Sequence, residues 1–537
     1  MRFEEVLDEV GGFHRFQFVI LHILSIPRVI LPLNFLLHNF ISAVPPHHCA
    51  LPHLDDRYAD HTPQPQLLPH DPDGALSPCR QFPELENFNS SGTGSNGSVP
   101  CQYGWTYDRR IFNSTTATEW DLVCDSKHLN QALATFFFMG VMMGAVLFGY
   151  LADRFGRKPM LLVSFVSSCV LGVAIAFSSS FLMFAICRTL SGVALTGMSI
   201  TTLALSIEWT GIKHRTFSGT ILSLGWSVGN MLLALLAYLL RDWRHLMLAV
   251  TAPCILAIAT WWWVPESARW LLVNGRVEEA QRVLQQCAKM NGKTSKLDKE
   301  TLLKVTINEE PSKDHSYLDL VKTPKLRKIS LCSGIVWFAV AFTYYGISFN
   351  ISGFGLNAYL TQFIYGAIEV PAKVGTYFLL DRIGRRNGQA WSLILCGMLI
   401  GANTAIPSGY SGVRTGVAVC GKGFSEAAFT IAFLYTAELF PTVIRQCGLG
   451  YTSFMGRLGG SLAPLLIMLD DVWSSAPSLV FSIAAVISGC VAFLLPETLR
   501  VRLPETIQDV EEGRHTMAEV EMSEMNPNLL VSREEEN

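Results

Sequence analysis

Long apolar segments recur along this chain and constrain its fold more than any other feature. A helix needs roughly 20 apolar residues to cross about 30 Å of hydrocarbon, and lipid-exposed backbone must satisfy its own hydrogen bonds. The chain is 50% hydrophobic and 16% charged, whereas a soluble domain is about a quarter charged. We therefore expect an all-α membrane protein with twelve transmembrane helices. The candidate spans are 18–41, 130–151, 160–179, 181–206, 217–240, 245–264, 329–349, 355–379, 389–408, 413–436, 447–469 and 476–495.

The spans divide the chain into five regions. The first span follows a polar start and is too long for the apolar core of a signal peptide, so we expect it to remain in the protein. The predicted regions are a cytoplasmic N-terminus (1–17), a six-helix half (18–264) that includes an extracellular loop (42–128), a cytoplasmic loop with short helices (265–328), a second six-helix half (329–495) and an acidic cytoplasmic tail (496–537).

The orientation follows from the placement of positive charge, because cytoplasmic loops are enriched in Lys and Arg. The segment 266–328 is rich in both, and 42–128 is poor in them for its length. Short loops are the stronger indicators. Two basic clusters stand in such loops: Arg154, Arg157 and Lys158, and Arg382, Arg385 and Arg386. Both termini are therefore predicted to be cytoplasmic.

The predicted extracellular loop contains an even number of cysteines, which suggests two disulfides with three possible pairings. These cysteines are Cys49, Cys79, Cys101 and Cys124. Five histidines stand in the first part of the loop, between residues 47 and 70, but their irregular spacing does not predict a metal site, and we expect no cofactor. They are His47, His48, His53, His61 and His70.

Three Asn-X-Ser/Thr patterns in the same loop are candidate glycosylation sites, which require exposure outside the cytoplasm. They begin at Asn89, Asn96 and Asn113. A fourth pattern, at Asn350, stands at a membrane edge and is a weaker candidate.

Three short motifs occur twice at nearly one spacing. "LADRFGRK" (151–158) matches "LLDRIGRR" (379–386), "EWTGIKHR" (208–215) matches "ELFPTVIR" (438–445), and "VPESARW" (264–270) matches "LPETLR" (495–500). The offsets are 228, 230 and 231 residues, so the two halves are homologous. Parallel repeats of this kind are the plan of secondary transporters, whose substrate site lies near midplane between the halves.

The repeated motifs place opposite charges at predicted cytoplasmic helix ends. Such pairs can latch helix ends in one conformation and release them in another, or they can simply mark the helix ends. We favour a gating network. Its members are Asp153, Arg154, Arg157, Glu208, Arg215, Glu266 and Arg269 in the first half, and Asp381, Arg382, Arg385, Glu438 and Arg445 in the second.

These motifs resemble the major facilitator superfamily, and the chain to about residue 511 is similar to solute carrier family 22, the organic ion transporters. The stretches that carry the resemblance are "FEEVLDEVGGFHRFQF", "AVPPHHC", "EWDLVC", "LADRFGRK", "VPESARWLL", "YYG", "ELFPTVIRQ" and "LPETIQDV". Three more, "SIPRVILPLNFLL", "SYLDLVKTPKLRKISLC" and "GRLGGSLAP", look closest to the organic anion transporters of that family.

The resemblance implies a carrier that exposes an organic anion alternately to the two sides of the plasma membrane, by exchange or facilitated diffusion. Aromatic carboxylates, dicarboxylates and urate- or nucleotide-like anions are the implied substrates. It further implies function as a monomer and a basolateral location in epithelial cells.

Arg457 is the foremost candidate for the anion site. It stands well inside an apolar span, where a basic residue costs about 2.5–3.5 kcal/mol on insertion scales and is expected to face a cavity or a partner. Anion-handling members of the family resemble this chain in having a basic residue there, whereas cation-handling members have an acid. A structural ion pair inside the bundle is the alternative.

Three further cations stand in or near spans. Lys373 matches a lysine of the anion transporters and would add positive potential to the cavity, but Glu369 one turn earlier could pair with it. Lys422 could bind substrate or extend toward a helix end. Arg28 could serve the anion site or bond a neighbouring helix.

Aromatic side chains suit flat, partly apolar anions. The resemblance assigns to the cavity Tyr344, Tyr345, Trp226, Phe429, Phe433 and Asn39. Plain packing is the alternative for each aromatic residue.

Other classes of function find less support. No GxxxxGK[ST] loop indicates ATP-driven pumping, the loops show no catalytic grouping, and no nucleic-acid partner is expected. The rivals are a cation or zwitterion carrier of the same family, and a membrane receptor that works through its ectodomain.

Overall fold

The structure is a computed structural model. It describes residues 3–50, 68–69, 77–82, 98–211, 214–293, 302–303, 317–349, 357–407, 409–471, 473, 475–499, 501, 504 and 507–512. Among the sites predicted from sequence, Asn89, Asn96, Asn350, His53, His61 and His70 lie outside these residues, as does the acidic tail beyond 512.

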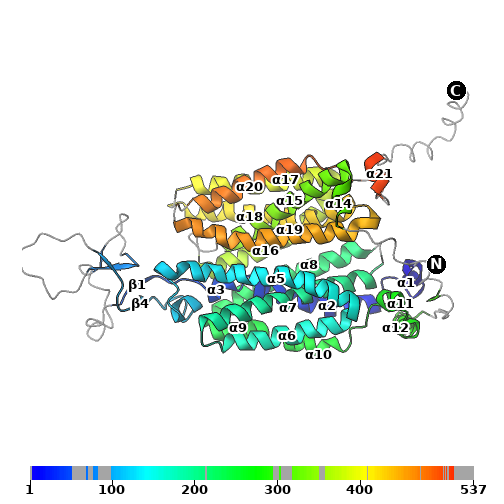
Figure 1. Cartoon of the computed structure of the whole chain (residues 1–537), viewed down its shortest axis with the longest axis horizontal. Coiled ribbons are helices and arrows are strands. Elements are labelled where there is room, and N and C mark those ends of the chain that lie inside the picture. Colours follow the sequence, from blue (N-terminus) through cyan, green and yellow to red (C-terminus); the bar gives the residue numbers. More distant parts are fainter. Residues whose placement is uncertain are drawn as a thin grey trace, which may run out of the picture.

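Two helical bundles lie side by side, one from each half of the sequence (Figure 1). The N-terminal bundle comprises α2 (Arg15–Phe35), α3 (His38–Ile41), α5 (Lys127–Phe155), α6 (Arg157–Ala176), α7 (Phe181–Trp209), α8 (Arg215–Leu239), α9 (Trp243–Thr251) and α10 (Pro253–Trp261). The C-terminal bundle comprises α15 (Pro324–Phe349), α16 (Ala358–Ile383), α17 (Arg385–Ala405), α18 (Ser411–Leu439), α19 (Arg445–Ile467) and α20 (Ala476–Ala492).

The observed helices confirm the twelve-helix fold. In the described part of the chain, nine helical segments are long and apolar enough to cross a membrane. The other three expected spans are the helices α16, α17 and α20. The sixth span consists of two helices because Pro253 begins a new helix directly after α9.

The repeated "DRxGR" motif forms the same turn in both halves. Gly156 (φ 100°) separates α5 from α6, and Gly384 (φ 91°) separates α16 from α17. A Cβ at Gly156 would stand 2.5 Å from a carboxylate oxygen of Glu266, and one at Gly384 would stand 2.5 Å from that of Glu497. Both positions therefore require glycine for its backbone conformation and for space.

The two ends of the bundle differ. One end carries two short antiparallel ribbons, and we call it the outer end. The other carries small helices, including the first and the last helix of the described chain, and we call it the inner end (Figure 1). The outer elements are β1 (His47–Cys49), β2 (Arg80–Gln81), β3 (Val99–Pro100), β4 (Trp105–Tyr107), α4 (Thr116–Glu119) and the 3-10 helix η2 (Cys124–Ser126). The inner elements include α1 (Phe3–Glu9), α11 (Ala268–Val273), α12 (Val277–Met290), α14 (Asp319–Lys322) and α21 (Ile507–Glu512). Two more 3-10 helices, η4 (Thr442–Ile444) and η5 (Met468–Asp471), precede and follow α19.

Two disulfides hold the outer ribbons together. Strand β1 pairs with β4 and β2 with β3. Of the three pairings that the sequence left open, the structure has Cys49–Cys101 and Cys79–Cys124. His47 lies close to Cys79 and Cys124, but the disulfide withdraws both sulfurs as thiolate metal ligands.

The halves meet through two helix pairs, α8 with α16 and α5 with α19. Near the outer end, Tyr359 of α16 stacks on Phe40 and contacts Phe112 and Tyr238. Its hydroxyl donates to the Ile111 carbonyl oxygen at 3.0 Å. The outer end is therefore closed by an aromatic contact between the halves.

Candidate transport site

Four charged side chains meet in the middle of the bundle, and we call them the charge cluster: Glu369, Lys373, Lys422 and Glu426. They come from α16 and α18. Lys422 Nζ lies 3.3 Å from a Glu369 oxygen, Lys373 Nζ lies 3.7 Å from the other Glu369 oxygen, and Lys373 Nζ lies 3.2 Å from Glu426. None of the four is more than 5% exposed. Isolated charges buried to this extent would be very costly, so the pairing is what makes their burial possible.

Hydrogen bonds tie the charge cluster to the other half. Ser227 of α8 donates to Glu369 at 3.0 Å, and Asn230 donates to it at 3.3 Å. Lys373 donates to Ser227 at 2.7 Å and to the Ser223 carbonyl oxygen at 2.9 Å. Glu369 and Lys373 therefore link α16 to α8 across the interface between the halves.

Tyr344 connects this cluster to the aromatic residues. Its hydroxyl donates to Glu369 at 2.8 Å and accepts from Trp226 Nε1 at 2.9 Å. Lys422 Nζ lies 3.2 Å from the centre of the Tyr344 ring, which is a cation–π contact. The structure thus brings together Tyr344, Trp226, Lys373 and Lys422 of the predicted site. The pairing of Lys373 with Glu369, which the sequence left as an alternative, is present.

The cluster carries no net charge, because its two carboxylates balance its two ammonium groups. Lys373 and Lys422 are fully occupied by these carboxylates, Ser348 and the α8 oxygens. They contribute little net positive potential to an anion at this level.

Arg457 and Arg28 differ from the lysines. Arg457 lies in the middle of α19, half-buried, and donates to the backbone and side-chain oxygens of Ser453. Arg28, near the middle of α2, donates to Ser199 at 3.3 Å, and its Nε is buried without a partner. Within the described residues, neither arginine has an acidic partner. Tyr345 interacts electrostatically with both arginines, and also with Glu426 and Glu369.

The predicted phenylalanines lie beside this region. Phe429 packs edge-on against Tyr344, with ring centres 5.3 Å apart. Phe433 is 51% exposed and packs against Trp337, with ring centres 4.7 Å apart. Trp337 of α15, which the sequence reasoning missed, donates its Nε1 proton to Thr436 at 2.6 Å and packs against both phenylalanines of α18.

Asn39 lies closer to the outer end and joins the halves there. Its amide donates to the Ser348 carbonyl oxygen at 2.7 Å and to Gln362 at 3.1 Å. Gln362 in turn donates to Asn230. Asn39 is thus part of the contact that closes the outer end.

At the inner end, the repeated charges form one arrangement in each half. Arg157 lies 2.9 Å from Asp153 and 3.2 Å from Glu208. Arg385 lies 3.1 Å from Asp381 and 3.2 Å from Glu438. Each arginine therefore joins three consecutive helices of its own half.

A third acid completes each arrangement. Glu266 accepts from the backbone N–H groups of Arg157 and Lys158 at the start of α6, a favourable place for a carboxylate. Burial raises the pKa of the Glu266 carboxyl, and these hydrogen bonds oppose the rise. Glu497 caps α17 in the same way through the N–H groups of Arg385 and Arg386. The sequence reasoning missed Glu497, although it is the counterpart of Glu266 in the repeated "PES/PET" motif.

The remaining predicted members of the network lie in various surroundings. Arg154 and Arg382 are exposed, and Arg154 donates to Tyr150. Arg445 donates to the Phe440 carbonyl oxygen at 3.2 Å. Arg269 belongs to α11, and the side chain of Arg215 lies outside the described part. Glu208 shares a repeated motif with Arg215, and Glu438 shares the matching motif with Arg445. In the structure Glu208 and Glu438 contact Arg157 and Arg385, because the turn glycines bring these arginines beside the helix ends.

Glu426 is the largest omission of the sequence reasoning. An acid inside an apolar span is a functional candidate by default, and the stretch "GKGFSEAAF" displays one four residues after Lys422. That spacing places both side chains on one face of α18.

Comparison with known proteins places this geometry in a family. Residues 88–509 match the model of the family described as sugar (and other) transporter. The chain is 50% identical to solute carrier family 22 member 7 of Bos taurus over 527 residues, which cover 95% of this chain and 96% of the relative. The Homo sapiens member 7 is 49% identical over 528 residues, with the same coverage. The chain belongs to solute carrier family 22.

Other matches agree with this family 22 assignment. Member 6-B of Xenopus laevis is 38% identical over 535 residues, which cover 97% of each chain. Among solved structures, the inward-open xylose transporter XylE from E. coli aligns with a TM-score of 0.64 and 14% identity, over 92% of this chain and 99% of that one. The latter likeness shows the fold alone. The family 22 chain is therefore a multi-pass membrane transporter and not an enzyme, and the resemblance found in its motifs is confirmed.

Proposed function

We propose that this family 22 chain is a secondary transporter of small organic anions. The observation that carries the proposal is the contrast inside the bundle: the charge cluster is neutral, whereas Arg457 and Arg28 have no acidic partner in the described part of the chain. The unbalanced charge between the halves is therefore positive.

Arginine is well suited to hold a carboxylate in such a place. Its planar guanidinium binds carboxylates through two parallel hydrogen bonds and keeps its charge when buried. The nearby aromatic rings of Tyr345, Phe429 and Phe433 offer area for flat ligands. Aromatic carboxylates, dicarboxylates and urate- or nucleotide-like anions combine these two features.

The transport cycle would alternate between the present arrangement and its opposite. The contacts of Asn39 and Tyr359 close the outer end here, and opening that end requires them to separate. The Arg157 and Arg385 ion pairs would keep the helix ends of each half together as the halves rock. Exchange for a counter-anion or simple downhill flow would drive the cycle.

The orientation and setting complete the proposal. The outer end faces the extracellular side of the plasma membrane, the inner end with both termini faces the cytoplasm, and the chain functions as a monomer, in epithelia at the basolateral membrane. Asn113 is exposed at the outer end, as a glycosylation site must be, and Asn89 and Asn96 belong to the same loop.

A carrier for organic cations or zwitterions is the second candidate, and Glu369 and Glu426 are the observation that favours it. Their carboxylates lie at the level of the transport site and would attract a cation if the lysines moved away. Two lysines within 4 Å of these acids argue against that selectivity.

Uptake measurements separate the two candidates. Cells that express the chain would be given labelled glutarate, salicylate, urate and tetraethylammonium, with and without an outward dicarboxylate gradient. We expect uptake of the anions above that of control cells and stimulation by the gradient if the carrier exchanges. Uptake of tetraethylammonium alone would refute the anion assignment.

A further inference from the structure

A third arginine inside the helical bundle lies away from the charge cluster, near the outer end. Arg188 belongs to α7, about 10 Å along the helix from its outer end at 1.5 Å per residue. It is 3% exposed. Its Nη2 donates to the Asn34 carbonyl oxygen at 2.5 Å, while its buried Nη1 has no hydrogen-bond partner among the described residues. Within the described residues it forms no ion pair.

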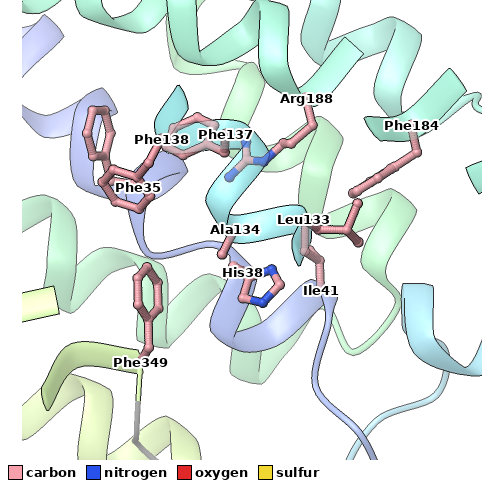
Figure 2. Close-up of a pocket in the computed structure, with 10 residues that line it drawn as sticks. All are labelled: Phe35, His38, Ile41, Leu133, Ala134, Phe137, Phe138, Phe184, Arg188 and Phe349. Atoms are coloured by element: carbon pink, nitrogen blue, oxygen red, sulfur yellow. The ribbon is translucent and has the colours of Figure 1, made fainter. Parts of the chain in front are cut away.

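The space beside Arg188 is a small pocket with aromatic walls (Figure 2). About 250 Å³ of space lies between its atoms, part of it open to the outside, and its lining contains no acidic side chain. The guanidinium carbon of Arg188 lies 4.2 Å from the centre of the Phe137 ring. His38 of α3 lines the same pocket. The other lining residues are Phe35, Ile41, Leu133, Ala134, Phe138, Phe184 and Phe349.

An unpaired guanidinium in such a place has one natural complement, which is an anion. Aromatic rings whose edges face the pocket also favour an anion, because the edge of an aromatic ring carries its partial positive charge. An imidazole can donate a further hydrogen bond. The limited volume restricts the ligand to a small monovalent anion, whether an inorganic ion or a short carboxylate.

Phe349 makes the pocket depend on the state of the carrier. It comes from α15 in the C-terminal half, whereas the other lining residues belong to the N-terminal half. Its ring lies edge-on to His38, with ring centres 6.1 Å apart, and packs against Phe138. In this closed arrangement the space is too narrow for a water molecule. Separation of the halves at the outer end removes Phe349 and opens the pocket.

We propose that Arg188 and His38 form a small-anion site, separate from the transport site at Arg457, that is occupied when the outer end is open and is closed by Phe349. Occupancy would stabilise the outward-open conformation, because a ligand shifts an equilibrium toward the state that it binds better. The site is independent of which organic solute the carrier moves.

The test uses the purified full-length chain in detergent and does not require transport. The thermal unfolding midpoint is measured at constant ionic strength while gluconate is replaced stepwise by chloride, and in a second series by formate. Binding to the folded chain raises the midpoint as the anion concentration rises. The wild-type chain should show this rise with chloride, with formate or with both. A rise with only one of them identifies whether the site binds an inorganic ion or a short carboxylate.

The matched variants are Arg188→Gln and Arg457→Gln. The first removes the guanidinium of the proposed anion site, and the second removes the guanidinium of the transport site. We expect the rise to disappear in Arg188→Gln and to persist in Arg457→Gln. In Phe349→Ala the pocket stays open. The anion concentration that gives half of the maximal rise in the unfolding midpoint should therefore be about tenfold lower. A wild-type chain without any rise, or a rise that survives in Arg188→Gln, overturns the proposal. So does a rise that depends on Arg457 and not on Arg188.

If Arg188→Gln does not fold, Arg188→Lys and His38→Gln decide the matter. Each should require about tenfold more anion for half the rise. Unchanged anion dependence in both variants would overturn the proposal.

Discussion

Lys373 and Lys422 lie deep in the same bundle as Arg457 and Arg28, yet the two pairs of cations have different surroundings. Each lysine has a carboxylate within 4 Å, at Glu369 or Glu426. Among the described residues, the hydrogen bonds of the arginines go only to serine oxygens. The difference indicates that a cation inside a membrane span is not by itself a ligand site. Its neighbours decide whether its charge is available.

The largest effect should follow a change at Arg457. Arg457→Asp replaces an available positive charge by a negative one in a low-dielectric site, so the uptake of labelled glutarate and salicylate should fall at least a hundredfold, or about 2.7 kcal/mol. Arg457→Lys should retain part of the activity, because the charge stays while the two-bond geometry is lost.

Surface expression, measured by biotinylation, is the control for Arg457, since a buried unpaired acid can prevent folding. If Arg457→Asp reaches the surface and transports anions with unchanged affinity, Arg457 is structural. Arg28→Gln sharpens the comparison from the other half. We expect it to raise the KM for anions by about tenfold.

The charge cluster should respond mainly in stability. Glu426→Gln leaves Lys373 without one of its carboxylates, and breaking a buried pair costs about 3–5 kcal/mol. The unfolding midpoint of the purified chain should fall accordingly. The double variant Lys373→Met with Glu426→Gln should recover part of this loss, because it leaves one carboxylate opposite one lysine. If the double variant loses more stability than the two single variants lose together, these residues do not act as a pair.

At the inner end, the buried acids should have larger effects than the exposed ones. The side chains of Glu208 and Glu438 are 15% and 17% exposed, whereas those of Asp153 and Asp381 are each 76% exposed, and exposed pairs contribute about 0–1 kcal/mol. Glu208→Gln or Glu438→Gln should slow turnover about fivefold with little change in KM. Charge reversal at Asp153 or Asp381 should also slow turnover more than it weakens binding, because neither aspartate is near the transport site.

Initial rates and KM, normalised to surface expression, provide the measurement for these inner-end variants. Normal turnover with altered KM in all four variants would contradict a role of these ion pairs in the conformational change.

The smallest effect concerns the outer end. Asn113→Gln should reduce the mass shift that a glycosidase produces and leave transport unchanged, because the side chain of Asn113 is exposed at the outer end. A triple variant that also replaces Asn89 and Asn96 should show no shift. A wild-type chain without any shift, whose outer loop resists external protease, would reverse the orientation.

The sequence by itself determined the architecture of this protein. Apolar segments of about 20 residues can only be spanning helices, and three motifs repeated at a separation of about 230 residues require two similar halves. The glycine in each "DRxGR" motif determined the turn that follows, since only glycine adopts that backbone conformation easily. Arg457 was also evident, because a charge inside an apolar span is conspicuous.

Only the tertiary structure decided the role of the other charges. Whether Lys373 has a partner depends on Glu426 of α18 and Ser227 of α8, which lie 53 and 146 residues away in the chain. The sequence likewise left three disulfide pairings, and the fold selected one. Local patterns reveal which side chains face the interior. Electrostatic pairing there is a property of residues that meet only after the halves have packed together, so it cannot be read from one helix at a time.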